Sequence, residues 1–405
     1  MIKSLLKNDF AKKTTSLFSG SLAASLISLL SFFIIAKLYS VDVLGEYYMF
    51  VAVVTILNMV STFGYLQTMP LLKDSELRDM YFSIGFLAFI ILIVVSPALV
   101  FYIEHWLLLI FNSYLVVVFS LNEQLFIRDQ KIKELNTARI SRTVINMIFL
   151  ISSFYIFGDD LLCMIIMNVI AILVTNIFIY IYFIKNYSLF KMVKFDFSVL
   201  KEYLKFPRFI GPGMIFHTLA YQVPILVAGN FFSPAIAAYY NMAYKLVYTP
   251  ASLISGSVNQ VFMGKLSISN RNNSNIFNGF IKLAGVLSIV AIVFVTLTVA
   301  LLPWVVDMVF GQKWIGSVDI SIALLPLIFS LIAIAPLTNI FQFTNNQKHI
   351  FKVHFFSFVI ALVAFGVAVL LSDYIVGVWL FSIMMFVRYI FIALRLNSIR
   401  KEHNA

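Results

Sequence analysis

The sequence predicts an all-α membrane protein with about twelve spanning helices, in two six-helix lobes around a central cavity. Of its 405 residues, 61% are hydrophobic and 12% are charged, and the mean hydropathy is +0.97. Soluble domains carry about 25% charged residues, so no water-soluble packing could hide this much apolar surface. The apolar runs are long and continuous, whereas a transmembrane β-barrel would show short alternating segments.

Twelve segments are apolar enough for a spanning helix, which needs about 20 mostly apolar residues. They cover residues 16–38, 45–66, 80–103, 106–122, 143–157, 161–184, 207–230, 236–262, 279–305, 318–343, 351–371 and 374–396. The fourth and fifth are the shortest. The basic N-terminus before the first segment resembles a signal peptide, but the apolar run is too long, so we expect an uncleaved first helix.

The basic residues give the expected orientation. With the N-terminus in the cytoplasm, all but three of the 29 lysines and arginines fall on cytoplasmic ends and loops; the three are Lys37, Lys245 and Lys313. Both termini are then cytoplasmic. The net charge of +11 is explained by this topology and by contact with anionic membrane lipids, so it implies no nucleic-acid partner.

Two cytoplasmic stretches, 123–142 and 185–206, mix basic and apolar residues. This pattern is typical of interfacial helices on a membrane surface, and we expect both to lie on the inner leaflet. The second divides the chain into an N-terminal six-helix lobe over 1–184, an inter-lobe linker over 185–206, and a C-terminal six-helix lobe over 207–405. The single cysteine, Cys163, excludes an intrachain disulfide.

The two predicted lobes share a short motif. SVDVLGEYY at 40–48 and SPAIAAYYN at 233–241 both begin with serine, and each has a small residue five positions later and a tyrosine two positions after that. Six spans lie in each half, so both halves start on the same side of the membrane. This indicates a parallel repeat related by an axis along the membrane normal, although chance similarity between two helix pairs remains the alternative.

Lys245 is the deepest charge in the predicted spans. It lies about nine residues into the segment 236–262, where a charge costs about 3 kcal/mol or more. Helical spacing places it on one face with a series of polar or small residues: Asn241, Thr249, Ser252, Ser255, Gly256 and Asn259. Two interpretations stay open. Lys245 either pairs with an acidic residue or reaches the outer interface, or it attracts an anion into a wet cavity.

The seventh span combines possible bends with polar groups. Pro207, Gly211, Pro212 and Pro224 favour a kinked or broken helix, which is either a packing kink or a hinge beside a cavity. Tyr221 and Gln222, with Asn58 on the second span, are further candidate substrate contacts. His217, Glu46 and Asp307 are candidates for ion coupling, each with a structural or interfacial alternative.

Three segments together resemble bacterial polysaccharide flippases, the carriers of O-antigen and capsule repeat units. They are GSLAASLISLLSFFIIAKLYSVDVLGEYYMFVAVVTILNMVSTFGY, AAYYNMAYKLVYTPASLISGSVNQVFMGKLS and VFGQKWIGSVDISIALLPLIFSLIAIAPLTN. Their order and spacing carry the similarity, which extends from about residue 18 to 350. This family belongs to the multidrug/oligosaccharidyl-lipid/polysaccharide exporter superfamily. Of the family's basic cavity positions, Lys37 and Lys245 match residues of this chain.

The resemblance implies a function in polysaccharide, including lipopolysaccharide, biosynthesis. The implied flippase moves a polyprenyl-diphosphate-linked oligosaccharide from the cytoplasmic to the periplasmic leaflet of the bacterial inner membrane by alternating access. Membrane lipids and other polysaccharide assembly proteins are the expected partners. No cofactor and no metal site is expected, and coupling to a proton or sodium gradient stays open.

Two rival functions remain. A cation-coupled multidrug exporter of the same superfamily would favour a deeply buried carboxylate, whereas here the deepest charge is a lysine. A membrane enzyme of polysaccharide assembly would need a large outer loop or a spaced acidic pair, whereas the outer loops are short and Asp159 and Asp160 are adjacent. We therefore expect no catalytic residues and no enzymatic activity.

Overall fold

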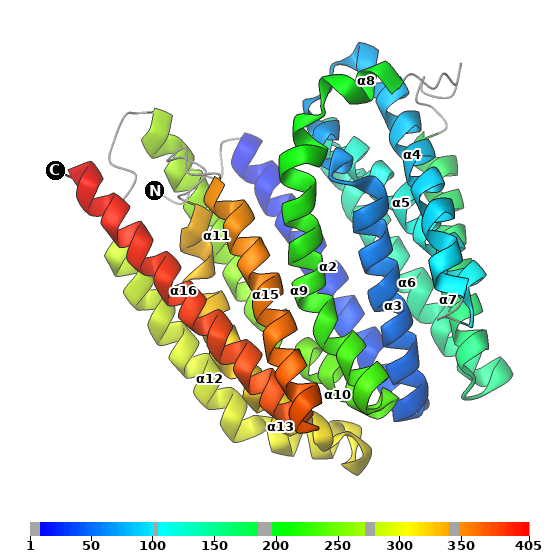
Figure 1. Cartoon of the computed structure of the whole chain (residues 1–405). Coiled ribbons are helices and arrows are strands. Elements are labelled where there is room, and N and C mark those ends of the chain that lie inside the picture. Colours follow the sequence, from blue (N-terminus) through cyan, green and yellow to red (C-terminus); the bar gives the residue numbers. More distant parts are fainter. Residues whose placement is uncertain (1–8, 101–103, 185–196, 272–279, 340–347, 405) are drawn as a thin grey trace. The chain divides into compact units, whose positions relative to one another are not determined.

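The computed structural model describes residues 9–100, 104–184, 197–271, 280–339 and 348–404. Within these ranges the chain forms helices joined by short turns, and no β-strand occurs in the described part. The chain divides into two compact units, which we call unit 1 (Met1–Gln222) and unit 2 (Val223–Ala405). The long helices of each unit run side by side (Figure 1).

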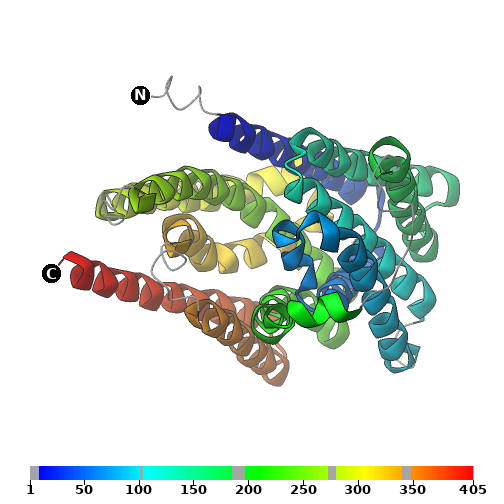
Figure 2. The same cartoon turned by 90° about the horizontal axis from the view of Figure 1, so that it is seen from above.

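Unit 1 holds six long helices, the short helix α8 and the first part of α9 among its described residues. They are α2 (Asp9–Leu38), α3 (Val41–Thr62), α4 (Asp74–Val100), α5 (Trp106–Arg128), α6 (Ile132–Phe157), α7 (Leu161–Ile179), α8 (Phe197–Glu202) and α9 (Gly211–Val227). A 3-10 helix, η1 (Tyr65–Leu71), follows α3, and the π-helices η2 (Tyr180–Ile184) and η4 (Phe206–Ile210) follow α7 and precede α9. The main partner of α2 is α6, which lies alongside it in Figure 2.

Unit 2 is built around α13 (Gly316–Ala333), in which two thirds of the residues are buried. This helix contacts α10, α11, α12 and α16. The other elements are η5 (Ala228–Phe232), α10 (Pro234–Ala243), η6 (Tyr244–Tyr248), α11 (Thr249–Arg271), α12 (Phe280–Phe310), η7 (Gln312–Trp314), η8 (Ala335–Asn339), α15 (Lys348–Leu371) and α16 (Tyr374–Asn404). Of these, η5 and η6 are π-helices.

Each of the twelve predicted spans overlaps described helices, so the expected all-α membrane architecture is confirmed. Ten helices in the described ranges are long and apolar enough to cross a membrane. The first predicted span is α2, whose described apolar part, Leu22–Leu38, is slightly shorter than the others. The eighth, 236–262, is divided between α10, the π-helix η6 and α11, and it is not among the ten.

The stretch 123–142 does not form interfacial helices, and this expectation is corrected. Its first residues extend α5 to Arg128, and α6 begins at Ile132, so the fourth and fifth spans are longer than predicted. Only a tight turn at residues 129–131 joins them, with Gln130 at φ 54°. Charged residues of this stretch form ion pairs within the helix bundle, such as Arg139 with Glu123. Their charge therefore does not require a loop at the membrane surface.

The linker 185–206 is described from residue 197 onward; residues 185–196 lie outside the described part. The described helix α8 packs on α4, with Val199 and Leu200 buried. The hydroxyl of Tyr65 donates to the Leu200 carbonyl (3.2 Å), and that of Tyr203 donates to Glu76 (2.8 Å). This end of the linker is therefore held on unit 1.

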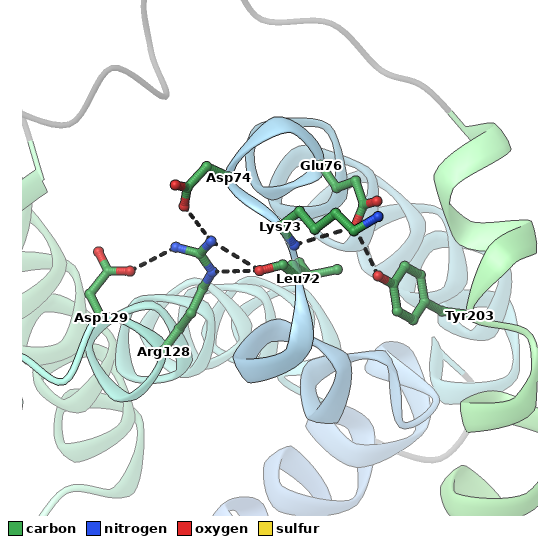
Figure 3. A network of polar contacts seen from close by, with 7 residues as sticks. All are labelled: Leu72, Lys73, Asp74, Glu76, Arg128, Asp129 and Tyr203. Carbon is green, nitrogen blue, oxygen red and sulfur yellow. Dashed lines mark hydrogen bonds and ion pairs between the residues drawn. The ribbon is translucent and has the colours of Figure 1, made fainter.

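A cluster of polar contacts around Arg128 fixes the turn between η1 and α4 (Figure 3). The Arg128 guanidinium donates twice to the Leu72 carbonyl, at 3.0 and 3.2 Å. It also forms ion pairs with Asp74 and Asp129. Glu76 accepts from the Lys73 backbone N–H as well as from Tyr203. One arginine thus joins the end of α5 to the start of α4.

The shared SVDVLGEYY and SPAIAAYYN motifs adopt the same local structure. Ser40 caps the N-terminus of α3 by accepting from Val43 N–H, and Ser233 caps α10 by accepting from Ile236 N–H. A side-chain oxygen in this position satisfies a helix donor that has no partner within the helix. The tyrosine seven residues after each serine, Tyr47 or Tyr240, is buried in its own unit. The motif therefore begins equivalent helices, as the predicted repeat requires.

Candidate functional site

In unit 2, Lys245 lies in the π-helix η6 and is half-buried. Pro250 explains the wide turn, because proline has no N–H to donate one helical turn back and its ring clashes with that turn. A π-turn accommodates one extra residue and is often found at functional sites. The lysine therefore occupies a locally widened helix within the predicted span 236–262.

Three tyrosines form a ladder beside this lysine. Tyr240, Tyr244 and Tyr248 follow one another along α10 and η6, and the last two rings are stacked with centroids 4.2 Å apart. The Tyr240 ring also meets Tyr374 of α16 edge to face. Flat aromatic faces of this kind pack against the apolar faces of other rings and against cations. Sequence reasoning missed the ladder, although its spacing of four residues was visible.

Two buried donors near Lys245 have no hydrogen-bond partner in the described structure. They are the Asn241 amide nitrogen and the Tyr240 hydroxyl. Asn241 is half-buried one turn before Lys245, as predicted from helical spacing. Asn259, further along α11, is half-buried too. A buried donor left unpaired costs about 1–3 kcal/mol, so this part of unit 2 has unused hydrogen-bonding capacity.

In unit 1, the predicted contacts lie on several helices. Lys37 is exposed in the last turn of α2, and Glu46 is exposed on α3. Asn58 is half-buried on α3 and donates to the Ser120 hydroxyl of α5 at 3.3 Å. Asn58 is therefore already engaged within the unit.

The residues of the predicted bends lie in η4 and α9, together with three predicted contacts. Pro207 lies in the π-helix η4, and Gly211 and Pro212 begin α9. His217 is exposed and its ring lies 5.0 Å from the ring of Tyr221, which, like Gln222, is half-buried. Pro224 is buried, and its carbonyl accepts from the Tyr374 hydroxyl at 3.1 Å. The boundary between the units falls within α9, between Gln222 and Val223.

The three candidates for ion coupling lie on three different helices: Glu46 on α3, His217 on α9 and Asp307 on α12. Asp307 is exposed and accepts from the side-chain amide of Gln312. Among the described residues, no group of three or more histidine, cysteine, aspartate and glutamate side chains could hold a metal ion.

A cluster of amide side chains inside unit 1 was not predicted. Asn168 of α7 accepts from Asn112 of α5 (3.0 Å) and donates to Asn146 of α6 (2.8 Å) and to the hydroxyl of Tyr47 of α3 (2.9 Å). The cluster thereby joins four spanning helices. Each asparagine is a polar residue in an apolar run, which is the signal that could have revealed it. The oxygen of Asn112 has no described hydrogen-bond donor.

Next to this cluster is a charged group that sequence reasoning assigned to a loop. Glu123 of α5 and Arg139 of α6 form an ion pair of 2.6 Å, with both side chains mostly buried. Arg142, one turn after Arg139, places its guanidinium 4.4 Å from the centre of the Phe119 ring. These charges belong to the helix bundle of unit 1.

Unit 1 also has a largely apolar pocket of about 470 Å³ between α4, α5 and α7. Aromatic residues dominate its lining, with Phe86, Phe89 and Tyr114 among them. At one end the Tyr81 hydroxyl donates to the Asn122 carbonyl oxygen at 2.7 Å.

Comparison with known proteins agrees with this architecture. A solved structure titled "Lipid II flippase MurJ, inward closed conformation" matches 94% of this chain and 87% of its own, with 14% identity and a TM-score of 0.76. An outward-facing multidrug resistance MATE transporter of the MOP superfamily matches 98% of both chains, with 12% identity and a TM-score of 0.60. At these identities the likeness is one of fold.

Sequence relatives give the family. The "Teichuronic acid biosynthesis protein TuaB" of Bacillus subtilis (strain 168) is 25% identical over 126 residues, which are 31% of this chain and 26% of that protein. The chain thus spans about a quarter of the length of that relative. A family model described as "Polysaccharide biosynthesis protein" matches residues 79–319, more than half of the chain. The protein therefore belongs to the polysaccharide biosynthesis protein family, as the resemblance of its sequence motifs predicted.

Proposed function

We propose that the protein is a flippase for a polyprenyl-diphosphate-linked oligosaccharide, an O-antigen repeat unit or a similar surface polysaccharide precursor. The observation that carries this proposal is a half-buried lysine, Lys245, within a predicted span of a polysaccharide biosynthesis family member. A charge at this depth is costly and is usually kept for a function. The fold shared with the MurJ and MATE structures supports transport as that function.

The chemistry of η6 suits the substrate. A diphosphate cannot cross about 30 Å of hydrocarbon without compensation for its lost hydration. The Lys245 ammonium supplies charge-assisted hydrogen bonds, and the unpaired Asn241 amide and Tyr240 hydroxyl can meet phosphate or sugar oxygens. The stacked Tyr244 and Tyr248 rings resemble the flat surfaces on which sugars pack. Lys37, Asn259, Tyr221 and Gln222 remain proposed further contacts.

The proposed direction is from the cytoplasmic to the periplasmic leaflet of the bacterial inner membrane, with both termini in the cytoplasm. Moving negative charge outward is favoured by about 2.3 kcal/mol per charge per 100 mV of inside-negative potential. Alternating access would bend α9 near its prolines and expose the site to each side in turn. Exchange of a proton or sodium ion through Glu46, His217 or Asp307 is a further proposal. Catalysis is not part of the proposed role.

The test is made in the native host. The gene is deleted, and a membrane-impermeant sugar-modifying probe is applied to intact and to permeabilised spheroplasts. If the proposal is right, the lipid-linked repeat unit accumulates and reacts only after permeabilisation. Appearance of the unit at the outer face at the normal rate would favour the multidrug exporter, and failure to make the unit would favour an enzyme of its assembly.

Complementation then tests Lys245. Lys245→Ala should leave the unit in the inner leaflet, and Lys245→Arg, which keeps the charge, should restore part of the transport. Lys282→Ala is the matched control, because Lys282 is an exposed lysine at the start of α12 in the same unit. Equal transport by Lys245→Ala and the control at equal protein levels would remove Lys245 from the proposed site.

A further inference from the structure

We propose that Arg142 forms a phosphate-binding site inside unit 1. The inference rests on the proposed function for the identity of the phosphate carrier, and on the geometry of unit 1 for the site itself. It begins with the place of Arg142 in the fold. Ten residues of α6 precede it, so it lies about 15 Å along a helix that is long and apolar enough to span the membrane.

The surroundings of Arg142 lie inside the helix bundle rather than on the lipid face. Its guanidinium covers the ring of Phe119, a side chain of α5 that is 1% exposed. It is also close enough to Glu123 and to the buried Tyr47 for electrostatic interaction. Asn146, one turn further along α6, belongs to the amide cluster. Arg142 therefore points toward the polar interior of unit 1.

The charges in this interior do not balance. Glu123 forms its ion pair with Arg139 at 2.6 Å, and no salt bridge joins it to Arg142. Arg139, Arg142 and Glu123 together carry two positive charges and one negative charge. An arginine stays protonated under all physiological conditions, so the excess charge is permanent. A second anion is needed to neutralise it.

The hydrogen-bonding groups of Arg142 are also unused. A guanidinium has five N–H donors, and the described part of the chain contains no acceptor bonded to any of them. The contact with Phe119 compensates only in part, because a cation–π interaction is worth about 0.5–2 kcal/mol. Arg142 is half-buried, so part of the residue remains accessible.

A phosphate group fits these requirements best. Arginine presents two parallel N–H donors that match two phosphate oxygens, and such bidentate pairs are among the strongest hydrogen bonds in proteins. The Tyr47 hydroxyl and the Asn146 amide oxygen already accept from Asn168, so the guanidinium itself supplies the binding groups of the proposed site. The phosphate could belong to the diphosphate of the lipid-linked substrate or to the headgroup of a membrane lipid.

The first experiment uses the wild-type protein in nanodiscs of phosphatidylcholine. Modification of individual arginines by phenylglyoxal is followed by mass spectrometry, without addition and with inorganic pyrophosphate, undecaprenyl diphosphate or phosphatidylglycerol. The expected result is severalfold slower modification of Arg142 with pyrophosphate and with undecaprenyl diphosphate, and no change at Arg395, an exposed arginine of α16. Unchanged modification of Arg142 with all three additions would overturn the site.

The comparison among the additions identifies the source of the phosphate. Stronger protection by undecaprenyl diphosphate than by phosphatidylglycerol assigns the site to the transported substrate. Equal protection by both lipids assigns it to headgroups of the membrane, and the phosphate site stands in either case. Because the experiment needs no variant, it remains decisive even if substitutions at Arg142 prevent folding.

Variants give the second measurement. Arg142→Gln should bind undecaprenyl diphosphate roughly tenfold more weakly than wild type, the loss expected for one charge-assisted pair. Arg142→Lys should lie between them, and Arg395→Gln should match wild type. Arg142→Gln binding within twofold of wild type would contradict the proposal. If phosphate binding depends on Arg142 but the leaflet assay shows no transport, the proposed function fails and the phosphate site stands. If transport occurs but phosphate compounds do not slow the modification of Arg142, the phosphate site fails and the proposed function stands.

Discussion

Gly64 and Gly211 touch through their backbones, although 147 positions separate them in the chain. A Cβ atom added at Gly64 would lie 2.7 Å from the Gly211 Cα, and one added at Gly211 would lie 2.6 Å from the carbonyl oxygen of Phe63. Gly64 also has φ 80°, which L-residues rarely adopt. The contact fixes the start of α9 against the end of α3 within unit 1, at a distance that only glycine permits.

Gly211→Ala should destabilise the protein by about 1–3 kcal/mol, because the added methyl group meets backbone atoms that cannot rotate away. The measurement is thermal unfolding of the purified protein in detergent. The control is Gly285→Ala in α12, where an added Cβ has nothing within 4 Å and removing a helix glycine is neutral or stabilising. Equal unfolding temperatures for the two variants would show that the close contact does not constrain α9.

Pro224→Ala should stiffen α9. Proline leaves the carbonyl of Ala220 without a helix donor at this point, directly beside the boundary between the units. Alanine restores the missing N–H, so we expect unchanged or higher thermal stability together with slower appearance of the lipid-linked unit at the outer face. Tyr374→Phe removes only the hydrogen bond to the Pro224 carbonyl and should cost about 1 kcal/mol. Faster transport by Pro224→Ala would argue against a hinge here.

Arg128→Gln should lower stability by about 1–3 kcal/mol, because the Leu72 carbonyl and two carboxylates lose a mostly buried donor. Arg128→Lys should recover little, since an ammonium lacks the planar fork that serves several acceptors at once. Unfolding by a denaturing detergent measures both. The control is Arg78→Gln, whose ion pair with the neighbouring Asp79 is partly exposed and should contribute little. A loss as large for Arg78→Gln would contradict this difference.

Asp160 makes the α6–α7 corner sensitive to acid. Its carboxylate accepts from the Cys163 backbone N–H at 2.7 Å, and this bond lowers the pKa of Asp160 below the usual range. A lowered pKa in the folded state means that stability is present above the unfolded carboxyl pKa and falls as the pH drops through the folded value. Asp160→Asn keeps a capping oxygen but cannot titrate, so its unfolding temperature should depend less on pH in acid.

Hydrogen exchange of the Cys163 amide, followed against pH, locates the effect. Wild-type protection should fall in acid, while protection in Asp160→Asn should stay constant. Asp159→Asn is a useful comparison, because Asp159 accepts instead from the N–H of Ser40, the residue that caps α3. The same acid dependence in wild type and Asp160→Asn would show that another group is responsible.

The spans could be predicted because each depends on a local property, a run of apolar residues long enough for the membrane. The boundary of α5 and α6 could not be predicted in this way. Glu123, Arg139 and Arg142 suggested a loop by their charge, yet Glu123 and Arg139 neutralise each other across two helices. Such pairing depends on tertiary contacts between residues 16 positions apart, which a hydropathy pattern does not contain.

The candidate site shows the same limit. The depth of Lys245 and its spacing from Asn241 were visible in the sequence, and Pro250 was a local sign of an irregular turn. The π-helix itself and the unpaired donors of Tyr240 and Asn241 depend on how α10 packs in unit 2. Likewise, Asn112, Asn146 and Asn168 were separate polar residues in the sequence, and only the folded unit joins them.

The pairing of α2 with α6 has a consequence for how the chain is made. The Tyr39 hydroxyl bonds the carbonyl of Leu150, which is 111 residues later in the sequence. At about 5–20 residues per second, a ribosome needs on the order of ten seconds to synthesise that stretch. During this time α2 is in the membrane without α6, its main packing partner. A translational pause before residue 132 would lengthen the interval in which α2 is unpaired with α6. The quality-control proteases of the cell would then have more time to degrade the chain.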